Sequence, residues 1–296
     1  MISVRKIGDL REEMRLSERP VLFVPTMGFF HEGHLSLIKI AASGREGAAF
    51  QGGVPSIDNR KSSIGVVVVS IFINPTQFGD GEDPAAYPRD EERDLRLAEA
   101  AGCDLAFLPL VEEMYTGGDS ATEVCVRSLS ERWEGEFRPG HLLGVATVVA
   151  KLLNIVQPDS AYFGEKDWQQ CRVVERMVKD LNFPVELRYG PTVREPDGLA
   201  MSSRNARLAP NDRTKAAALY HTLHVAAESV VGGRDPRAVE REAIDRLLAS
   251  GFSKVDYIAA VDGMTLEPID APNKGARVIA AAHIGGVRLI DNVAVD

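Results

Sequence analysis

The sequence has few of the features that mark membrane or secreted proteins. Its longest apolar stretches, residues 66–73 and 144–156, are too short or too interrupted to span a bilayer. The first fifteen residues are charged and lack an apolar core, so we do not expect a signal peptide. The three cysteines are scattered and odd in number, which gives neither a disulfide framework nor a zinc-binding spacing. We therefore expect a cytoplasmic protein with reduced thiols.

Positive charge is also scarce. Lys and Arg number 34 against 43 Asp and Glu, so the formal net charge is −9. Such a chain is a poor general partner for nucleic acid or for an anionic membrane surface, although it can still contain a local basic pocket for phosphates. We expect neither nucleic acid nor membrane as a partner. The composition, 45% hydrophobic and 26% charged in 296 residues, is typical of a globular protein with a sizeable core.

Short β-branched runs alternate with helical patterns through the first 191 residues. This alternation predicts an α/β fold with a Rossmann-like, doubly wound parallel sheet. After residue 191 the alternation ends, and a smaller α+β C-terminal domain is expected. We therefore divide the chain into domains at 1–191 and 192–296. Residues 44–64 are rich in Gly, Ser and Arg and have no period, so we expect a loop insertion there.

The individual elements follow from the same patterns. Strands are predicted at residues 21–24, 66–73, 104–108, 160–163 and 185–191, with a weaker one at 122–127, and at 255–261, 277–283 and 287–290 in the C-terminal domain. Helices are predicted at residues 7–18, 34–42, 87–101 and 145–156, with another ending near 181, and at 212–231 and 236–249.

The turn after the strand at 21–24, PTMGFFHEGH at residues 25–34, is the first candidate site. In a strand, glycine turn and helix, backbone N–H groups and the helix dipole converge and suit an anion. His31 and His34 can donate to phosphate oxygens. They are three residues apart with Gly33 between them, so they do not form the zinc-protease motif, and no third metal ligand is identifiable. The alternative is a loop with two solvated histidines.

Polar residues also follow two other predicted strands. Asn74 and Gln77, in NPTQFG, can bind a small polar ligand or simply form a turn. In GEKDWQQ, Lys166 suits phosphates, Asp167 can accept from ribose hydroxyls, and Gln170 faces the same side as Lys166. The alternative for this second motif is ordinary helix capping.

Two basic or hydroxyl-rich segments complete the set of motifs. FRPGHLLG, at residues 137–144, places Arg138 and His141 before a helix, where they can bind an anion or cap the helix. DGLAMSSRN, at residues 197–205, is a loop whose serines and arginine can form a phosphate clamp or cap a helix.

These motifs together resemble the pantothenate synthetase (pantoate–β-alanine ligase) family of the His-x-Gly-His nucleotidylyltransferase superfamily. The elements PTMGxxHxGH, NPxQF, FGEKD and AMSSRN occur in order, and the resemblance covers residues 4–292. It implies the ATP-dependent condensation of pantoate with β-alanine through a pantoyl adenylate, with release of pyrophosphate and AMP. It also implies ATP as a substrate, Mg²⁺ on the triphosphate without an identified protein ligand, and a homodimer. The family normally lacks an insertion at residues 44–64.

The resemblance also implies roles for individual residues. Alignment and charge stabilisation during catalysis would come from His31, His34, Lys166, Ser202, Ser203 and Arg204. Pantoate would be bound by Asn74, Gln77 and Gln170, while Arg138 and His141 are candidates for the β-alanine step. The other ATP-binding residues would be Pro25, Thr26, Met27, Gly28, Gly164, Asp167, Val193 and Met201.

Two other functions stay open. One is another nucleotidylyltransferase, such as phosphopantetheine adenylyltransferase, but those enzymes are shorter and lack NPTQFG and a second domain. The other is a catalytically silent nucleotide-binding protein. Pantoate-dependent release of AMP would separate these alternatives.

Overall fold

The computed structural model describes residues 1–45, 65–79, 83–116 and 122–295 and packs into two compact units. The first unit comprises Met1–Val126, Leu143–Gly164 and Val174–Gly190. The second comprises Arg127–Leu142, Glu165–Val173 and Pro191–Asp296. All residues from Pro191 onward therefore belong to the second unit, together with two earlier segments, 127–142 and 165–173.

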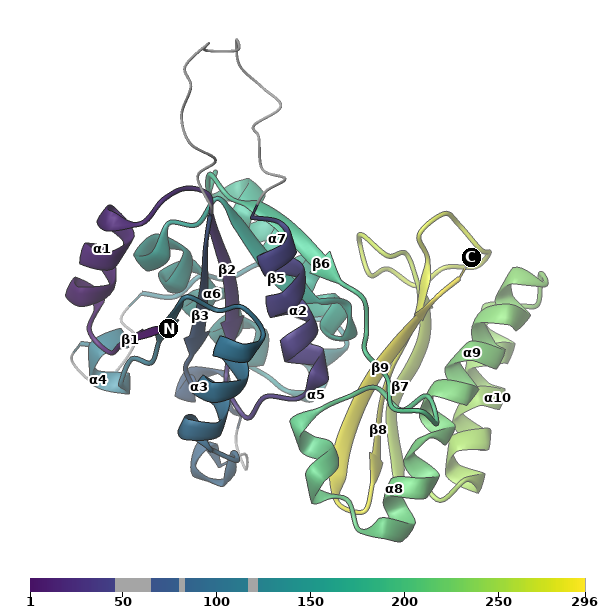
Figure 1. Cartoon of the computed structure of the whole chain (residues 1–296). Coiled ribbons are helices and arrows are strands. Elements are labelled where there is room, and N and C mark those ends of the chain that lie inside the picture. The colour runs from purple at the N-terminus through teal and green to yellow at the C-terminus, as the bar shows by residue number, and fades with distance from the viewer. Residues whose placement is uncertain (46–64, 80–82, 117–121, 296) are drawn as a thin grey trace. The chain divides into compact units, whose positions relative to one another are not determined.

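The first unit is built on a six-stranded sheet in the order β1-β4-β3-β2-β5-β6 (Figure 1). Every neighbouring pair is parallel, which confirms the predicted α/β class. Its strands are β1 Ile2–Val4, β2 Val21–Thr26, β3 Val66–Ile71, β4 Leu105–Phe107, β5 Ser160–Gly164 and β6 Glu186–Gly190. The middle of β3 is fully buried, as expected for a continuous β-branched run in a sheet covered on both faces.

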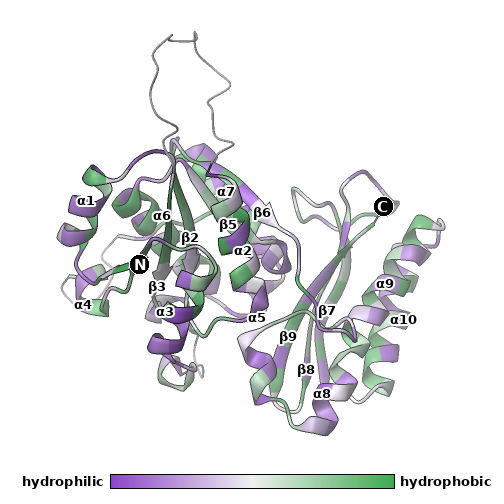
Figure 2. Cartoon of the chain, viewed as in Figure 1, coloured by the Kyte–Doolittle hydropathy of each residue, from purple (hydrophilic) through white to green (hydrophobic). Residues whose placement is uncertain are grey.

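Helices flank this sheet and bury its apolar side chains. They are α1 Ile7–Leu16, α2 Glu32–Ser43, α3 Glu91–Ala100, α4 Val111–Met114, α6 His141–Val156 and α7 Trp168–Asp180. Leu35, Ile38 and Ala41 of α2 pack against Leu22 and Val24 of β2 in one core cluster. In Figure 2, β2 is coloured as hydrophobic, whereas α1 and α3 contain hydrophilic stretches. The central strands are thus shielded, and their carboxyl ends are left to carry the polar turns.

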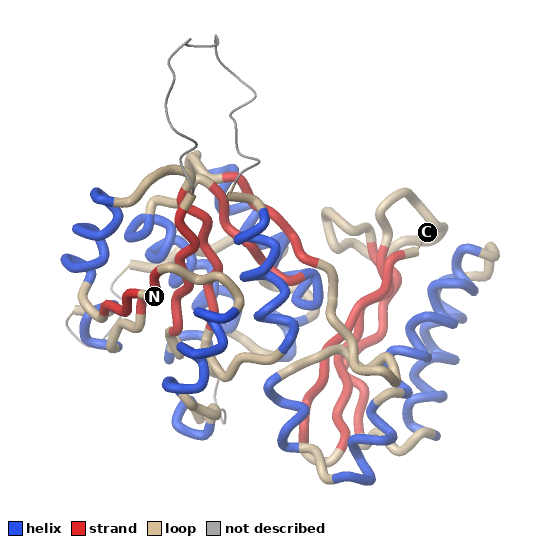
Figure 3. The backbone as a smooth tube through the Cα atoms, in the orientation of Figure 1, coloured by secondary structure: helices blue, strands red, loops and turns tan. Residues whose placement is uncertain are grey.

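The second unit contains a separate antiparallel sheet in the order β7-β8-β9, with helices beside it (Figure 3). The strands are β7 Lys254–Val261, β8 Arg277–Ile284 and β9 Val287–Ala294, and the helices are α5 Glu134–Phe137, α8 Pro210–Ala216, α9 Ala218–Val231 and α10 Pro236–Ala249. Successive side chains of β7 point to opposite faces of the sheet and pack into two different hydrophobic cores. Ile258 and Ala260 pack with α9 and α10, whereas Tyr257 and Ala259 pack with Trp133 and Trp168. The two early segments thus cover one face of this small sheet.

Several predicted elements need correction. The weak strand at 122–127 was wrong, because the described residues 122–126 form no strand. The helix expected from Tyr87 begins at Glu91, where the Asp90 side chain caps it by accepting from Arg93 N–H at 3.0 Å. The single helix expected at 212–231 is in fact two helices, α8 and α9, that meet at Ala217. The short strand β1 was not predicted. Most of the expected insertion, residues 46–64, lies outside the described residues.

Candidate active site

The two histidines of the PTMGFFHEGH turn form the N-terminal cap of α2. His31 Nδ1 accepts from the Gly33 N–H at 3.1 Å, and His34 Nδ1 accepts from the His31 N–H at 3.4 Å. The ring centroids lie 4.1 Å apart. Because both Nδ1 atoms act as acceptors, each neutral ring carries its proton on Nε2. The turn therefore offers two imidazole N–H donors at the positive end of a helix, an arrangement suited to phosphate.

Two glycines are required by close contacts in this turn. A Cβ at Gly33 would lie 2.9 Å from both Nδ1 and Cε1 of His31, where it would displace the capping ring. Gly28 has a φ of +84°, and a Cβ there would lie 2.9 Å from Ile71 Cγ2 and 3.0 Å from Asp94 Oδ2. The glycine spacing of the motif thus follows from how tightly the turn is packed.

Asp94 of α3 anchors the same turn, and sequence reasoning missed it. Its carboxylate, which is only 1% exposed, accepts from Phe29 N–H at 2.5 Å and Phe30 N–H at 2.7 Å. Burial raises the pKa of Asp94, although these two bonds act in the opposite direction. No local pattern distinguishes Asp94 from the other acidic residues of its charged helix. Its importance becomes apparent only from a contact 64 or 65 residues away in the chain.

The NPTQFG turn follows β3 and is held by the buried Asn74. Asn74 Nδ2 donates to Gly144 O at 3.1 Å and Gln77 Oε1 at 3.3 Å, and Oδ1 accepts from Tyr115 Oη at 2.8 Å. Gln77 Nε2 donates to Met27 Sδ at 2.7 Å. The structure thus brings Met27, Asn74 and Gln77 together. Both amide hydrogens of Asn74 are used within the protein, so a ligand that accepts from Nδ2 must replace one of these bonds.

The first unit contains nine of the predicted site residues. They all lie at or after the carboxyl ends of the adjacent strands β2, β3 and β5. This edge of a parallel sheet is where ligands bind in open α/β folds. The residues are Pro25, Thr26, Met27, Gly28, His31, His34, Asn74, Gln77 and Gly164.

The remaining predicted residues belong to the second unit, and four of them share one electrostatic environment. Lys166, in the short 3-10 helix Glu165–Asp167, donates from Nζ to Asp167 Oδ1 at 3.2 Å. Burial would raise the pKa of Asp167, but Lys166, Arg204 and His141 together lower it. Asp167 is therefore ionised at neutral pH and faces three cationic or ionisable side chains from three separate segments.

The hydroxyl-rich loop forms a short capped turn. Ser202 Oγ accepts from Arg204 N–H at 3.2 Å at the start of the 3-10 helix Ser203–Arg207, so Ser202 does act as a cap. Ser203 is buried. Met201 N–H donates to Val193 O at 3.0 Å, which brings together the two residues expected to line the adenine.

Arg138 and His141 lie in the 127–142 segment, which a buried ion pair holds to the small sheet. The Glu134 carboxylate accepts from Arg288 at 2.6 and 2.9 Å and from Tyr257 Oη at 2.8 Å. Burial opposes ionisation of Glu134, but Arg288 outweighs it and lowers its pKa. Arg138 Nη1 lies 3.7 Å from Glu134 Oε2, and His141 N–H donates to Arg138 O at 3.1 Å. Gln170 lies in the first turn of α7.

β9 supplies two further buried residues that sequence reasoning missed. Asp291 accepts from both Nη atoms of Arg194, at 2.7 and 3.0 Å. Asn292 Nδ2 donates to the backbone oxygens of Glu165 and Lys166, each at 2.9 Å. Neighbouring residues of one strand thus contact both the Lys166 turn and the segment that leads to Ser202.

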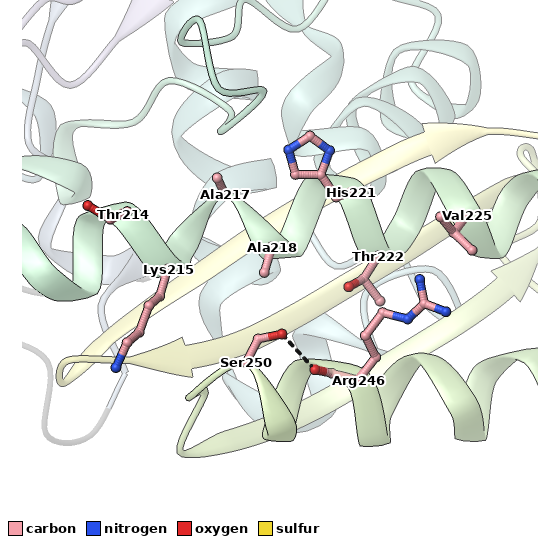
Figure 4. A pocket seen from close by; sticks show the side chains of 9 residues that line it. All are labelled: Thr214, Lys215, Ala217, Ala218, His221, Thr222, Val225, Arg246 and Ser250. Atoms are coloured by element: carbon pink, nitrogen blue, oxygen red, sulfur yellow. Dashed lines mark hydrogen bonds between the residues drawn. The ribbon is translucent and has the colours of Figure 1, made fainter.

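Other features of the described chain lie apart from these motifs. None of its helices is both long and apolar enough to cross a membrane. Across residues 1–45, 65–79, 83–116 and 122–295, no three His, Cys, Asp or Glu side chains are grouped to hold a metal ion. A hollow of about 550 Å³ is lined by residues of α8, α9 and α10, among them Thr222 and Arg246 (Figure 4). No predicted site residue lines that hollow.

The parallel sheet, the histidine-capped helix and the Lys-Asp and Ser-Ser-Arg turns define a Rossmann-like nucleotide-binding enzyme of the His-x-Gly-His class. Comparison with known families narrows this class. The family model described as Pantoate-beta-alanine ligase matches residues 2–294. The chain therefore belongs to the pantoate–β-alanine ligase family.

Individual relatives agree with this assignment. The chain is 48% identical over 297 residues to pantothenate synthetase of Rhizorhabdus wittichii, covering 99% of this chain and 98% of that protein. The crystal structure of pantothenate synthetase from Thermus thermophilus shares 45% identity and a TM-score of 0.88, covering 100% of this chain and 99% of that one. Pantoate-β-alanine ligase from Francisella tularensis, solved with beta-gamma ATP and β-alanine, shares 32% identity and a TM-score of 0.79, covering 99% and 97%.

Proposed function

We propose that the two turns bearing His31, His34 and Lys166, with the Ser202–Arg204 loop, carry out the reaction of this family. That reaction is the ATP-dependent condensation of pantoate with β-alanine to pantothenate through a pantoyl adenylate. The observation that carries the proposal is the capping arrangement of His31 and His34. In this arrangement each neutral imidazole carries its N–H on Nε2 at a helix N-terminus, a setting that suits a triphosphate.

The first step needs no protein nucleophile. The pantoate carboxylate attacks the α-phosphorus of ATP, an acyl-oxygen-to-phosphorus bond forms, and the bond to pyrophosphate breaks. The protein supplies alignment and positive charge as negative charge moves to the leaving group. We assign this role to His31, His34, Lys166, Ser202, Ser203 and Arg204. The lowered pKa of Asp167 supports it, because it reflects the positive charges of Lys166 and Arg204 acting on one carboxylate.

In the second step the β-alanine amine attacks the acyl carbon of the adenylate. The bond to AMP breaks, and the amine loses a proton as the amide forms. We assign Arg138 and His141 to this step, because Arg138 can pair with the β-alanine carboxylate. The Francisella relative solved with β-alanine supports this amine as the acceptor.

Further residues would hold the remaining parts of the substrates. Asn74, Gln77 and Gln170 would bind pantoate, and the hydrogen bond from Asn74 Nδ2 to Gln77 Oε1 supports a shared pocket for the first two. Gly164 and Asp167 would meet the ribose. Val193 and Met201 would line the adenine, in keeping with their backbone hydrogen bond. Pro25, Thr26, Met27 and Gly28 would contact ATP mainly through backbone.

We further propose that Mg²⁺ arrives with ATP, bound to its triphosphate oxygens. Mg²⁺ generally retains waters and substrate phosphates as ligands, so it needs few ligands from the protein. The metal would neutralise part of the triphosphate charge. Mg²⁺ titration of pyrophosphate release tests this requirement.

We also propose a cellular compartment, an oligomeric state and a domain movement for this protein. Cys103, Cys125 and Cys171 are free thiols rather than disulfides, which supports a reducing cytoplasm. The family resemblance supports a homodimer, which a light-scattering mass would test. We also propose that residues 192–296 form a smaller domain that closes over the ATP site through a hinge near Pro191.

The direct test uses purified protein with ATP, Mg²⁺ and pantoate, followed with and without β-alanine. We expect pyrophosphate with little AMP before β-alanine is added, and sustained AMP release afterwards. The absence of pantoate-dependent pyrophosphate would refute the proposed reaction. Pyrophosphate formation that needs no carboxylic acid would instead favour a different nucleotidylyltransferase.

A further inference from the structure

The Lys166 turn is fastened to β9 by one buried side chain, Asn292. This residue is 4% exposed, and its Nδ2 donates to Glu165 O and Lys166 O, both at 2.9 Å. Its Oδ1 accepts from Arg277 Nη1 at 2.5 Å. Both hydrogens of the Asn292 amide are thus directed at consecutive carbonyls of a short 3-10 helix. These bonds fix the peptide from which the Lys166 side chain emerges.

Arg277 of β8 provides a second connection to the same turn. Its Nη2 donates to Glu165 Oε2 at 3.0 Å, and its guanidinium carbon lies 3.6 Å from the centre of a Trp168 ring. Trp168 Nε1 in turn donates to Gly263 O at 2.8 Å. The backbone on both sides of Lys166 is therefore held, and Asn292 is the residue that contacts both Arg277 and the Lys166 peptide.

Such anchoring is needed because Lys166 is a flexible side chain. A lysine ammonium is a point charge on a four-carbon stem, so its placement depends on where its backbone is fixed. Asp167 accepts from Lys166 Nζ but is its immediate neighbour in the same short helix, so this bond does not hold the turn to β9. Small displacements of a charge-stabilising group can cost large factors in rate.

We propose that Asn292 is a positioning residue for the adenylation step, acting through Lys166. This inference rests on the proposed role of Lys166 at the departing pyrophosphate. Asn292 itself contacts no substrate. Its amide holds the Lys166 backbone so that the ammonium meets the charge that develops as pyrophosphate leaves. A purely structural role would instead lower stability while leaving the rate of the folded enzyme unchanged.

A double-mutant cycle on single-turnover pyrophosphate formation separates these roles. The variants are Asn292→Ala, Lys166→Ala and the double mutant, with Asn273→Ala as a matched control. Asn273 is an exposed asparagine of the same unit whose Nδ2 donates to Asp262 at 3.2 Å. We expect Asn292→Ala to slow pyrophosphate formation at least about 10-fold in the native background. In the Lys166→Ala background it should slow the step less than about 2-fold, and the control should change neither rate.

The possible failures are distinguishable. If Lys166→Ala alone keeps its rate, the proposed role of Lys166 is wrong. If Lys166→Ala is slow but Asn292→Ala is not, or if Asn292→Ala has the same effect in both backgrounds, the positioning role is refuted. Asn292→Asp, which keeps the acceptor for Arg277 but presents oxygen to the two carbonyls, serves as a second variant. If both Asn292 variants fail to fold, the residue is structural and the proposal is overturned.

Discussion

Replacing Gly33 by alanine isolates the capping geometry of the histidine turn. The added methyl group would lie 2.9 Å from Nδ1 and Cε1 of His31, closer than van der Waals contact allows. The His31 ring must therefore move, and its 3.1 Å hydrogen bond from the Gly33 N–H is lost. The change leaves both histidines in the sequence and perturbs only where the first of them lies.

The expected effects on stability and on rate differ strongly. Loss of an N-cap bond costs about 0.5–2 kcal/mol of unfolding free energy. Alanine in place of glycine within a helix returns about 0.5–1 kcal/mol. The free energy of unfolding should thus change by less than about 1.5 kcal/mol. Removing one donor to a transition state costs about 10²–10³ in rate. Since His31 is displaced rather than removed, we expect a decrease of at least about 10-fold in pyrophosphate formation.

A matched control exists in α1. Gly8 occupies the same second position of its helix as Gly33 does in α2, and a Cβ there would meet no atom within 4 Å. Gly8→Ala should keep full activity and unfold at the same or slightly higher urea concentration. Both variants would be compared by urea unfolding and by pantoate-dependent pyrophosphate release. Equal rates for Gly33→Ala and Gly8→Ala would show that His31 need not be held where the structure has it.

Three further predictions concern two residues of the site and one acidic residue of β7. Lys166→Ala should lose ~2–3 kcal/mol of transition-state stabilisation, which slows pyrophosphate formation by roughly 30- to 150-fold. Its melting temperature should not change. Near-normal turnover would show that Lys166 has no part in the mechanism. Asp94→Asn should lower the free energy of unfolding in urea by about 1–3 kcal/mol, because its amide NH₂ would face the Phe29 or Phe30 N–H. A urea midpoint equal to that of the native protein would contradict the anchoring role of Asp94. Asp256 is expected to contribute to acid stability: burial opposes its ionisation, but its partners Lys254, Arg288 and His283 lower its pKa to about 2. Since this folded pKa lies below the unfolded value of about 3.9, up to about 2 kcal/mol of stability is present above pH ~4 and is lost as the pH falls toward 2. Asp256→Asn should flatten the fall in melting temperature over that interval, and an unchanged slope would show that other carboxylates dominate.

Features governed by local sequence could be predicted well. The β-branched run at Val66–Ile71 is a central strand because such a run can only be buried on both faces. The strand, glycine and histidine pattern predicted a helix start at residue 34, two residues after the observed start at Glu32, because capping acts over a few residues. The assignments of individual side chains to substrates rest on the family resemblance and stay predictions.

Features that depend on distant contacts could not be predicted. Asp94 looks like one more acidic residue on a charged helix, and Asn292 looks like a polar residue just after the predicted terminal strand. Their roles come from backbone partners 64–65 and 126–127 residues away. The wrong strand at 122–127 rested on weak alternation alone, and no described strand pairs with those residues to compensate for that weakness. The break at Ala217 interrupts a continuous helical pattern without a proline or glycine to signal it.

The segments 127–142 and 165–173 of the second unit affect how the chain folds during its synthesis on the ribosome. Glu134 receives its partner Arg288 only after another 154 residues have been synthesised. Trp133 and Trp168 likewise donate to Leu266 O and Gly263 O, which come 133 and 95 residues later. Until the last strands emerge, the nascent polypeptide therefore carries indole rings and a carboxylate without their final neighbours. A truncated product ending at residue 191 would retain that exposed surface permanently, which makes it a natural substrate for chaperones and proteases.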